Sequence, residues 1–247
     1  MAPIAMVPVA MLTARTIPGA IAPGSNRWLD WGRHDDGIKG RVHMAAGRTA
    51  ELQRFIDGTE AAIMARAPDY PDAMAMAARI FSALKTKGGD APGNPPARQE
   101  ACRHLEQALG KAHDSPGPPG PIAELADAFA ALEPEFTWHR RLQSAQEPGG
   151  FHDNHANAII VGKGGLEDRG DALIGVSLVA PDIQYPRHRH PPEEIYLVLS
   201  PGQWMQNDNP MAAKQSGDLA HNPPNAWHAM RASEEPLLAV WCLWLEN

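Results

Sequence analysis

Apolar residues recur at helical spacing in the first half of the chain. From residue 49 they fall at intervals of three, four and seven, which predicts an amphipathic helix ending near residue 64. The same pattern predicts a second helix that Asp72 caps, a third over residues 97–113 and a fourth over residues 122–132. Loops rich in proline and glycine separate these helices, at residues 86–96 and 115–121.

Beyond residue 135 the apolar residues form short runs between turns instead. These runs are rich in Val, Ile, Leu and Trp, and they occupy residues 157–161, 173–179, 195–199 and 237–245. Such spacing is typical of strands in a sandwich or barrel. Both faces of the last run are apolar, so we expect that strand to be buried on both sides. The chain therefore divides into an irregular arm (1–48), a helical region (49–134) and a β domain (135–247).

Composition narrows the classes of protein that fit this pattern. The 247 residues include 22 Gly and 24 Pro, which argues against an all-helical bundle, while 43% hydrophobic residues argue against disorder throughout. The net charge is −7, and no basic block is longer than Arg140-Arg141, so a nucleic-acid partner is not expected. One large domain, or a domain with a helical extension, fits this length.

The compartment is constrained by weaker signals. Cys102 and Cys242 lie far apart and form no disulfide framework, which favours a reducing, cytoplasmic compartment. The apolar run at residues 4–12 has no basic residue ahead of it and is broken by Pro8, so it does not fit a signal peptide well. No stretch approaches the ~20 apolar residues of a membrane span.

Histidines are concentrated in one short segment of the β domain. His188 and His190 are two residues apart, so on a strand both project from one face. Glu194 and Tyr196 repeat this relation after two prolines, which we expect to turn the chain back towards the histidines. Two imidazoles and a carboxylate on one face suit a divalent ion such as Zn, Fe, Mn or Ni. A solvated polar loop is the alternative interpretation.

A second segment strengthens the metal interpretation. Gly217 is followed by five residues and Pro223, then by Asn225, and His228 stands three residues later. This turn can place His228 inside a barrel, on a strand next to the first segment. The two segments together resemble the paired motifs of the cupin superfamily, with Asn225 in the usual glycine position; asparagine also tolerates a left-handed turn. The resemblance covers about residues 150–245 and implies a mainly β fold, the double-stranded β-helix or jelly-roll barrel, here with an N-terminal helical region.

Within the cupins, the match extends to the string YPRHRHPPEEIYLVLS, which starts at Tyr185, and to Trp204 soon after it. Together with the helical extension, this string resembles the bacterial cupin-type dimethylsulfoniopropionate lyases. The resemblance implies that the chain cleaves a small sulfonium carboxylate to dimethyl sulfide and acrylate. It implies Tyr196 and Tyr185 as catalytic residues, and one divalent transition-metal ion held by His188, His190, Glu194 and His228.

The chemistry of such a reaction agrees with the residue types. β-Elimination needs a base for a weakly acidic proton next to a carboxylate, and a divalent ion on that carboxylate stabilises the charge that develops. A phenol near a cation can act as that base. Aromatic faces attract a sulfonium, and four tryptophans lie in the β domain: Trp204, Trp227, Trp241 and Trp244. Ordinary packing is the alternative role for each tyrosine and tryptophan.

Two other functions remain open at this point. Another metal-dependent cupin enzyme, such as a dioxygenase or isomerase acting on a small acid, would need the His/Glu set but neither tyrosine. A non-catalytic cupin would bind a small ligand without turnover. A homodimer is compatible with an arm that lies on a partner subunit, and a membrane partner is not expected. His152 and His155 resemble a second metal pair only weakly, and His221 is expected to be exposed or structural.

Overall fold

The computed structural model describes residues 48–66, 69–91, 93–114, 120–142, 147 and 149–245. The arm predicted for residues 1–48 therefore lies outside the described residues, apart from Arg48. Four α-helices are found in the described part, α1 (Ala50–Met64), α2 (Pro71–Leu84), α3 (Leu105–Gly110) and α4 (Pro121–Leu132). Short 3-10 helices occupy Glu100–His104, Lys111–His113, Glu133–Glu135 and Phe151–Asp153.

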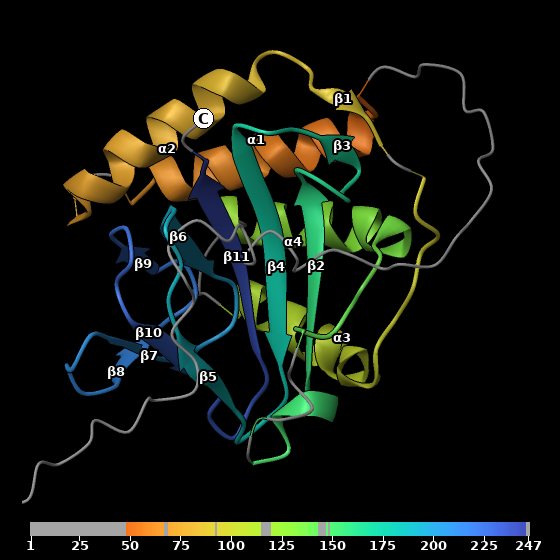
Figure 1. The fold of residues 1–247 in the computed structure, drawn as a ribbon. Helices are drawn as coiled ribbons and strands as arrows, with labels where there is room; N and C mark the ends of the chain where they lie inside the picture. The colour runs from red at the N-terminus through yellow and green to blue at the C-terminus, as the bar shows by residue number, and fades with distance from the viewer. Residues whose placement is uncertain are drawn as a thin grey trace, which may run out of the picture.

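The strands form a seven-stranded sheet and a separate four-stranded sheet (Figure 1). The larger sheet has the order β1-β3-β2-β4-β11-β6-β9, and the smaller has the order β5-β10-β7-β8. The bounds are β1 (Gly89–Asp90), β2 (His155–Val161), β3 (Glu167–Asp168), β4 (Ala172–Val179), β5 (Gln184–His188), β6 (Glu193–Val198), β7 (Gly202–Gln206), β8 (Ala212–Lys214), β9 (Leu219–Asn222), β10 (His228–Arg231) and β11 (Leu237–Trp244).

The last eight strands pair in a nested way. β4 pairs with β11, β5 with β10, β6 with β9 and β7 with β8, and every one of these pairs is antiparallel. The members of successive pairs alternate between the two sheets until the chain turns at β7 and β8. This is the eight-stranded, double-sheet jelly roll to which cupins belong. The predicted fold class, a cupin jelly roll with an N-terminal helical region, is confirmed.

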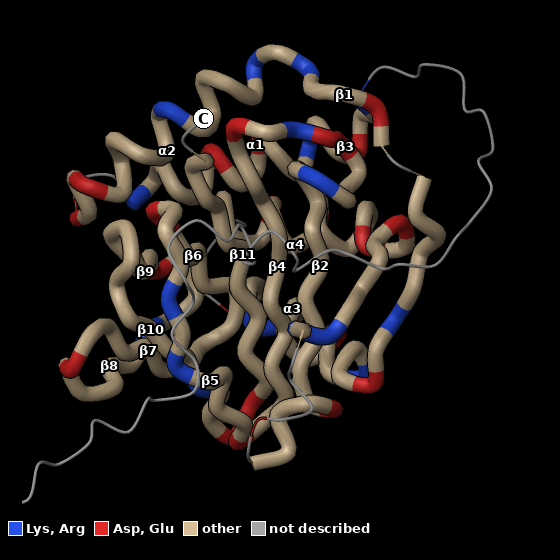
Figure 2. The backbone as a smooth tube through the Cα atoms, viewed as in Figure 1, with Lys and Arg blue, Asp and Glu red and all other residues tan. Residues whose placement is uncertain are grey.

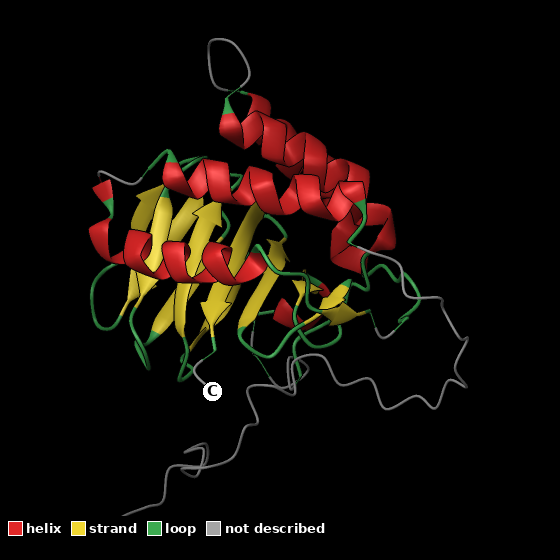
Figure 3. Cartoon of the chain, turned by 90° about the horizontal axis from the view of Figure 1, so that it is seen from above, coloured by secondary structure: helices red, strands yellow, loops and turns green. Residues whose placement is uncertain are grey.

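The strands of the large sheet separate two apolar cores. Alternate residues of a strand point to opposite faces, so on β11 the side chains of Val240 and Trp241 enter different cores. The outer core lies between the helices and the large sheet, and the helices line one side of the strands in Figure 3. It includes Phe55, Ile80, Phe129, Trp138, Ile174, Val176, Ile195, Leu197 and Val240.

The inner core lies between the two sheets. It comprises Phe151, Val179, Tyr185, Tyr196, Val198, Trp204, Met230, Ala232, Leu237, Ala239, Trp241, Leu243 and Leu245. The central strands β2, β4 and β11 carry no Lys, Arg, Asp or Glu, and they are therefore tan in Figure 2. In contrast, the neighbouring strand β6 carries a buried acid, Glu194, on the inner side of the large sheet.

Two details of the helical region differ from the prediction. Asp72 does not cap α2: Pro71 takes the first helical position, Tyr70 precedes it, and Asp72 lies in the first turn. The helix predicted over residues 97–113 starts only at Glu100 and is largely 3-10 in character. Ala97 cannot join it, because it forms a parallel β-bridge with Thr137. Its N–H donates to the Phe136 carbonyl, and its carbonyl accepts from the Trp138 N–H.

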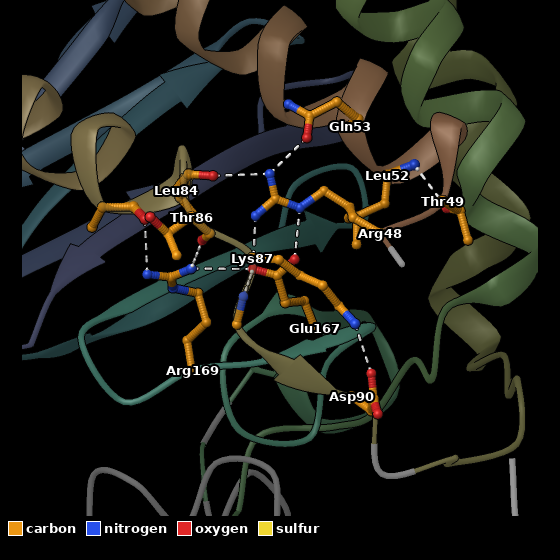
Figure 4. A network of polar contacts seen from close by, with 12 residues as sticks. Arg48, Thr49, Leu52, Gln53, Leu84, Thr86, Lys87, Asp90, Glu167 and Arg169 are labelled. Carbon is orange, nitrogen blue, oxygen red and sulfur yellow. Dashed lines mark hydrogen bonds and ion pairs between the residues drawn. The ribbon is translucent and has the colours of Figure 1, made fainter. Parts of the chain in front are cut away.

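A buried ionic network holds the helices to the edge of the large sheet. Glu167 of β3, 1% exposed, accepts hydrogen bonds from Arg48 at 2.6 and 2.8 Å, from the Gly88 N–H and from Arg169 (Figure 4). Arg48 also donates to the Leu84 carbonyl at the end of α2. Arg169 donates to the carbonyls of Ala83 and Thr86. These bonds fix the start of α1 and the end of α2 against β3.

Candidate metal centre

The predicted metal ligands come from three neighbouring places in the jelly roll. His188 ends β5 and His228 begins β10, and the two residues are direct partners in the antiparallel register. Glu194 is the second residue of β6. His190 is not on a strand as predicted, because β5 ends at His188; it enters from the turn between β5 and β6. All four side chains are at most 6% exposed.

The side-chain donor atoms of these residues converge on one spot. The ligand nitrogens of His188, His190 and His228 all lie within 4.8 Å of one another. The Oε2 atom of Glu194 is 3.3 Å from Nε2 of His190 and 3.2 Å from Nε2 of His228. Ligand atoms at about 2.1 Å from one ion lie roughly 3–4 Å apart, so small side-chain adjustments are enough to close this set around an ion.

The protonation of the three imidazoles also suits metal binding. Each Nδ1 lies 2.9 Å from a backbone carbonyl, and these carbonyls belong to Pro186, Pro192 and Ala226. A carbonyl only accepts, so each Nδ1 carries a proton, and a ring in this tautomer presents the lone pair of Nε2 to a metal ion when it is neutral. Metal-bound histidines are held in this way. A donor set of three imidazoles and one carboxylate fits a borderline divalent ion.

The turn of the second motif joins the first motif through the backbone. Asn225 has a φ of 61°, the left-handed conformation that its position in the motif predicted. Its N–H donates to the His190 carbonyl at 2.9 Å. The turn before β10 is therefore tied to the turn that carries His190, which fixes His190 and His228 relative to one another.

The carboxylate of Glu194 is held by residues that the sequence did not point out. Asn222 of β9, 3% exposed, donates its amide to Glu194 Oε2 at 3.0 Å. Gln206 of β7 in turn donates to Oδ1 of Asn222 at 3.2 Å, which fixes the direction of that amide. These residues meet only through the register of β6 with β9, so local spacing carries no signal for them.

The charges of the cluster reinforce one another. Burial would raise the pKa of Glu194, but the imidazoles of His190 and His228 outweigh it and hold that pKa well below its usual range. Burial lowers the pKa of His190, but the Glu194 carboxylate more than reverses this effect. Burial and the neighbouring His228 and Arg141 hold the pKa of His188 far below its usual value. At neutral pH Glu194 is thus an anion beside a neutral His188.

Both predicted catalytic tyrosines lie beside this cluster. Tyr196 follows Glu194 on the inner face of β6, and its ring centre is 6.2 Å from that of His228. Tyr185 lies on β5, with its ring centre 5.1 Å from that of His188. Burial, followed by the Glu194 carboxylate, raises the pKa of Tyr196 well above its usual range, and burial raises the pKa of Tyr185 to about 12. Both phenols are therefore protonated when no cation is nearby.

A polar chain runs deeper into the jelly roll from Tyr185. Asn157 donates its amide to the Tyr185 hydroxyl at 3.4 Å and accepts from the Ser177 hydroxyl at 2.7 Å. Ser177 in turn accepts from the indole N–H of Trp241 at 3.1 Å. Gly175 makes room for that indole, because a Cβ there would lie 2.2 Å from the Trp241 ring. The inner core thus contains a chain of hydrogen-bonded side chains that runs from Tyr185 to Trp241.

The four tryptophans of the β domain do not share one environment. Trp204 and Trp241 belong to the inner core, and the buried Nε1 of Trp204 has no hydrogen-bond partner in the described structure. Trp227 is 36% exposed, with Arg187 and Arg189 stacked at 4.9 and 4.6 Å from its ring centre. Trp244 packs at the outer core. Only Trp204 and Trp241 are placed to line a site between the sheets.

His155 and His221 lie outside this cluster and make other contacts. Both nitrogens of the buried His155 are used, because Nδ1 donates to the Phe151 carbonyl at 2.7 Å and Nε2 accepts the Arg141 N–H at 2.8 Å. Burial lowers the pKa of His155 to about 4, so this ring is a neutral structural group. His221 pairs with Glu193 at 2.7 Å, in the structural role expected for it.

The jelly roll and its buried His/Glu cluster define a cupin with a candidate metal centre. Residues 73–239 match the family model of the dimethylsulfoniopropionate lyases, a span that contains all the predicted site residues. The chain belongs to this family. The described residues contain no helix long and apolar enough to cross a membrane.

Individual relatives are similar over parts of the chain. The dimethylsulfoniopropionate lyase DddQ of Ruegeria pomeroyi is 30% identical over 123 residues, which are 49% of this chain and 61% of that protein. The chain thus spans about three fifths of the length of this curated relative. A crystal structure from a study of the DMSP lyases RdDddP and RnDddQII superimposes with a TM-score of 0.59 and 21% identity, covering 79% of this chain and 92% of that chain. The crystal structure of DddQ from Ruegeria pomeroyi gives 0.49 and 21%, covering 74% and 91%.

Proposed function

We propose that this protein is a metal-dependent lyase that cleaves dimethylsulfoniopropionate to dimethyl sulfide and acrylate by β-elimination. One observation carries the proposal. A buried His/Glu cluster, whose histidine nitrogens lie within 4.8 Å of one another, has the ring of Tyr196 next to that of His228, within the segment that matches the lyase family. A dioxygenase or isomerase would need the cluster but no phenol in that place. A ligand-binding cupin would need neither a base nor two buried tyrosines.

The metal ligands in this proposal are His188, His190, Glu194 and His228. A divalent ion bound there would polarise the substrate carboxylate and favour the ionised form of a nearby phenol. Asn222 holds the Glu194 carboxylate in its direction, and the backbone carbonyls hold the imidazoles. These contacts are made before any ligand enters, so little reorganisation is needed on binding.

Tyr196 is the general base in this proposal. With a divalent ion bound, the Tyr196 hydroxyl would lose its proton to solvent, and the resulting phenolate oxygen would accept the proton from the carbon next to the substrate carboxylate. The electron pair of that C–H bond forms the carbon–carbon double bond while the carbon–sulfur bond breaks, so dimethyl sulfide leaves as a neutral molecule. No acid is needed for this leaving group. Tyr185, held by Asn157 at 3.4 Å, orients the substrate on the opposite side of His188.

The sulfonium end of the substrate faces the aromatic side of the inner core. Trp204 and Trp241 are the tryptophans of that core, and the face of an indole attracts a soft cation. A substrate with a small cation at one end and a carboxylate at the other therefore matches the polarity of the site.

Product analysis tests this function directly. Metal-loaded protein is incubated with dimethylsulfoniopropionate, dimethyl sulfide is measured in the headspace and acrylate is measured in solution. We expect the two products in equal amounts. Release of dimethyl sulfide with 3-hydroxypropionate instead of acrylate would show a different reaction, and no release with any of Fe, Mn, Zn, Ni or Co would contradict the proposed lyase activity.

A further inference from the structure

The guanidinium of Arg141 lies over the ring of Tyr185, a residue of the inner core. Its backbone N–H is fixed by His155 at 2.8 Å, which holds the chain against β2. Its Cζ lies 5.8 Å from the centre of the Tyr185 ring, and that ring is in turn 5.1 Å from the His188 ring. The guanidinium and the candidate metal centre are therefore both neighbours of Tyr185.

One polar atom of this guanidinium, the buried Nη1, is left without a hydrogen bond by the described residues. The Arg141 side chain as a whole is 18% exposed. The nearest carboxylate is that of Glu147, 3.7 Å from Nη1, which is too far for a hydrogen bond. A buried guanidinium nitrogen without a hydrogen bond is unfavourable, and a ligand oxygen could supply that hydrogen bond.

The neighbouring arginine shows that this placement is specific. Arg140 is 33% exposed and pairs with Asp153 at 3.0 Å, although its buried Nε also has no hydrogen bond in the described structure. The charge of Arg141, in contrast, acts inside the jelly roll: it lowers the pKa of His188 and opposes the rise that burial causes in the pKa values of Tyr185 and Tyr196. Of these two adjacent arginines, only Arg141 contributes its charge to the site.

We infer that Arg141 recognises the carboxylate of the substrate, by donating from its guanidinium to a carboxylate oxygen while Glu147 moves aside. The inference rests on the proposed function, because it concerns the anionic end of that substrate. It also sets the orientation of the substrate. A guanidinium attracts the carboxylate and repels the sulfonium, so the carboxylate lies between Arg141 and the metal centre and the sulfonium points away from both.

Steady-state kinetics of Arg141→Met with metal-loaded protein test this assignment, with Arg140→Met as the matched control. A charge-assisted hydrogen bond made equally in ground and transition states predicts a KM about 10- to 100-fold higher and a kcat within about threefold of wild type. Arg140→Met should change neither constant more than about twofold. Arg141→Lys, which keeps the charge but not the planar fork, should fall between wild type and Arg141→Met.

A second readout separates recognition from a structural role. Acrylate and the neutral, isosteric acrylamide are compared as inhibitors, and Arg141→Met should reduce the preference for acrylate about tenfold or more. A residue that only covers Tyr185 would weaken both compounds equally, and that result would overturn the inference. An unchanged KM in Arg141→Met would overturn it as well.

Failure of the proposed function would be visible separately. If wild-type protein releases no dimethyl sulfide, calorimetry with acrylate still measures recognition of a small carboxylate. Binding that depends on Arg141 but not on Arg140 would support the inference while the lyase activity fails. Absence of acrylate binding to metal-loaded wild-type protein would contradict the inference itself.

Discussion

The outer and inner cores are built on opposite faces of the same strands, yet their contents differ. The outer core is filled with aliphatic and aromatic side chains, such as the cluster of Phe129 with Phe55, Phe136 and Trp138 at ring distances of 5.3–6.4 Å. The inner core places Tyr185 and Tyr196 among hydrogen-bonded polar groups and beside a buried His/Glu cluster. Stability and chemistry are thus assigned to different faces of one sheet, and variants in each face should separate the two properties.

The largest expected effect is on catalysis in the inner core. Tyr196→Phe should lower kcat about 10²- to 10⁴-fold, because it removes the proposed general base. Metal content and melting temperature should stay close to wild type, since the ring remains and only a buried hydroxyl is lost. Headspace dimethyl sulfide and elemental analysis measure both properties on the same preparation.

Tyr185→Phe is the matched control for that variant. We expect a smaller loss of kcat, because Tyr185 orients the substrate and does not accept the proton. A loss in Tyr185→Phe as large as, or larger than, that in Tyr196→Phe would show that the base has been assigned to the wrong tyrosine.

The next effect concerns stability and lies in the outer core. Phe129→Ala leaves a cavity among three aromatic rings and should lower the free energy of unfolding by about 3–5 kcal/mol. Activity per folded molecule should be unchanged at a temperature where the variant is folded. Met64→Ala, at a side chain 43% exposed, is the control and should cost less than about 0.5 kcal/mol. A tenfold loss of kcat in folded Phe129→Ala would show that the two cores are coupled.

The ionic network at Glu167 predicts a stability that depends on pH. Burial raises the pKa of Glu167, but its bonds to Arg48, the Gly88 N–H and Arg169 together lower it below the ordinary 4.5. A depressed carboxyl pKa stabilises the fold above that ordinary value, and the stabilisation is lost as the pH falls below it. Glu167→Gln should therefore cost about 3 kcal/mol at pH 7. Urea unfolding should show that this difference shrinks below pH 4.5; a difference independent of pH would contradict the ionic origin.

The smallest expected effect concerns the hydrogen bond from Asn222 to the proposed metal ligand Glu194. Asn222→Ala removes the amide that fixes Glu194 and should weaken metal binding about 10- to 100-fold, as outer contacts of metal ligands do. Asn94→Ala, at an exposed residue that bonds the Gly164 carbonyl, is the control and should leave metal affinity unchanged. Competition with a chromogenic chelator measures both affinities. Equal affinities in the two variants would show that Asn222 does not contribute to metal binding.

Local sequence patterns predicted the strands of a sandwich or barrel, and the resemblance to the cupins implied the jelly roll and the groups that meet in its cluster. The two-residue spacing of His188 and His190, and the turn before His228, were visible because both depend on short segments. Their roles as ligands stay predictions. The pattern placed both histidines on a strand, whereas β5 ends at His188 and a turn carries His190.

Contacts across strands and layers were not visible in the sequence. Asn222 reaches Glu194 only through the register of β9 with β6, and Arg141 reaches Tyr185 from a segment more than 40 positions away. The short strands β7, β8 and β9 have no long apolar run, so periodicity did not reveal them. Tertiary pairing also decided the start of the third helix, because Ala97 is held in a bridge with Thr137.

Metal titration of the activity tests the central claim most directly. Protein stripped with a chelator is titrated with one divalent metal while dimethyl sulfide release is followed, and His228→Ala is treated in parallel. We predict no release from the stripped protein, recovery that saturates at one ion per chain, and little recovery in His228→Ala at the same metal concentrations. Full activity in the stripped protein, or equal recovery in His228→Ala, would contradict a metal-centred reaction at this site.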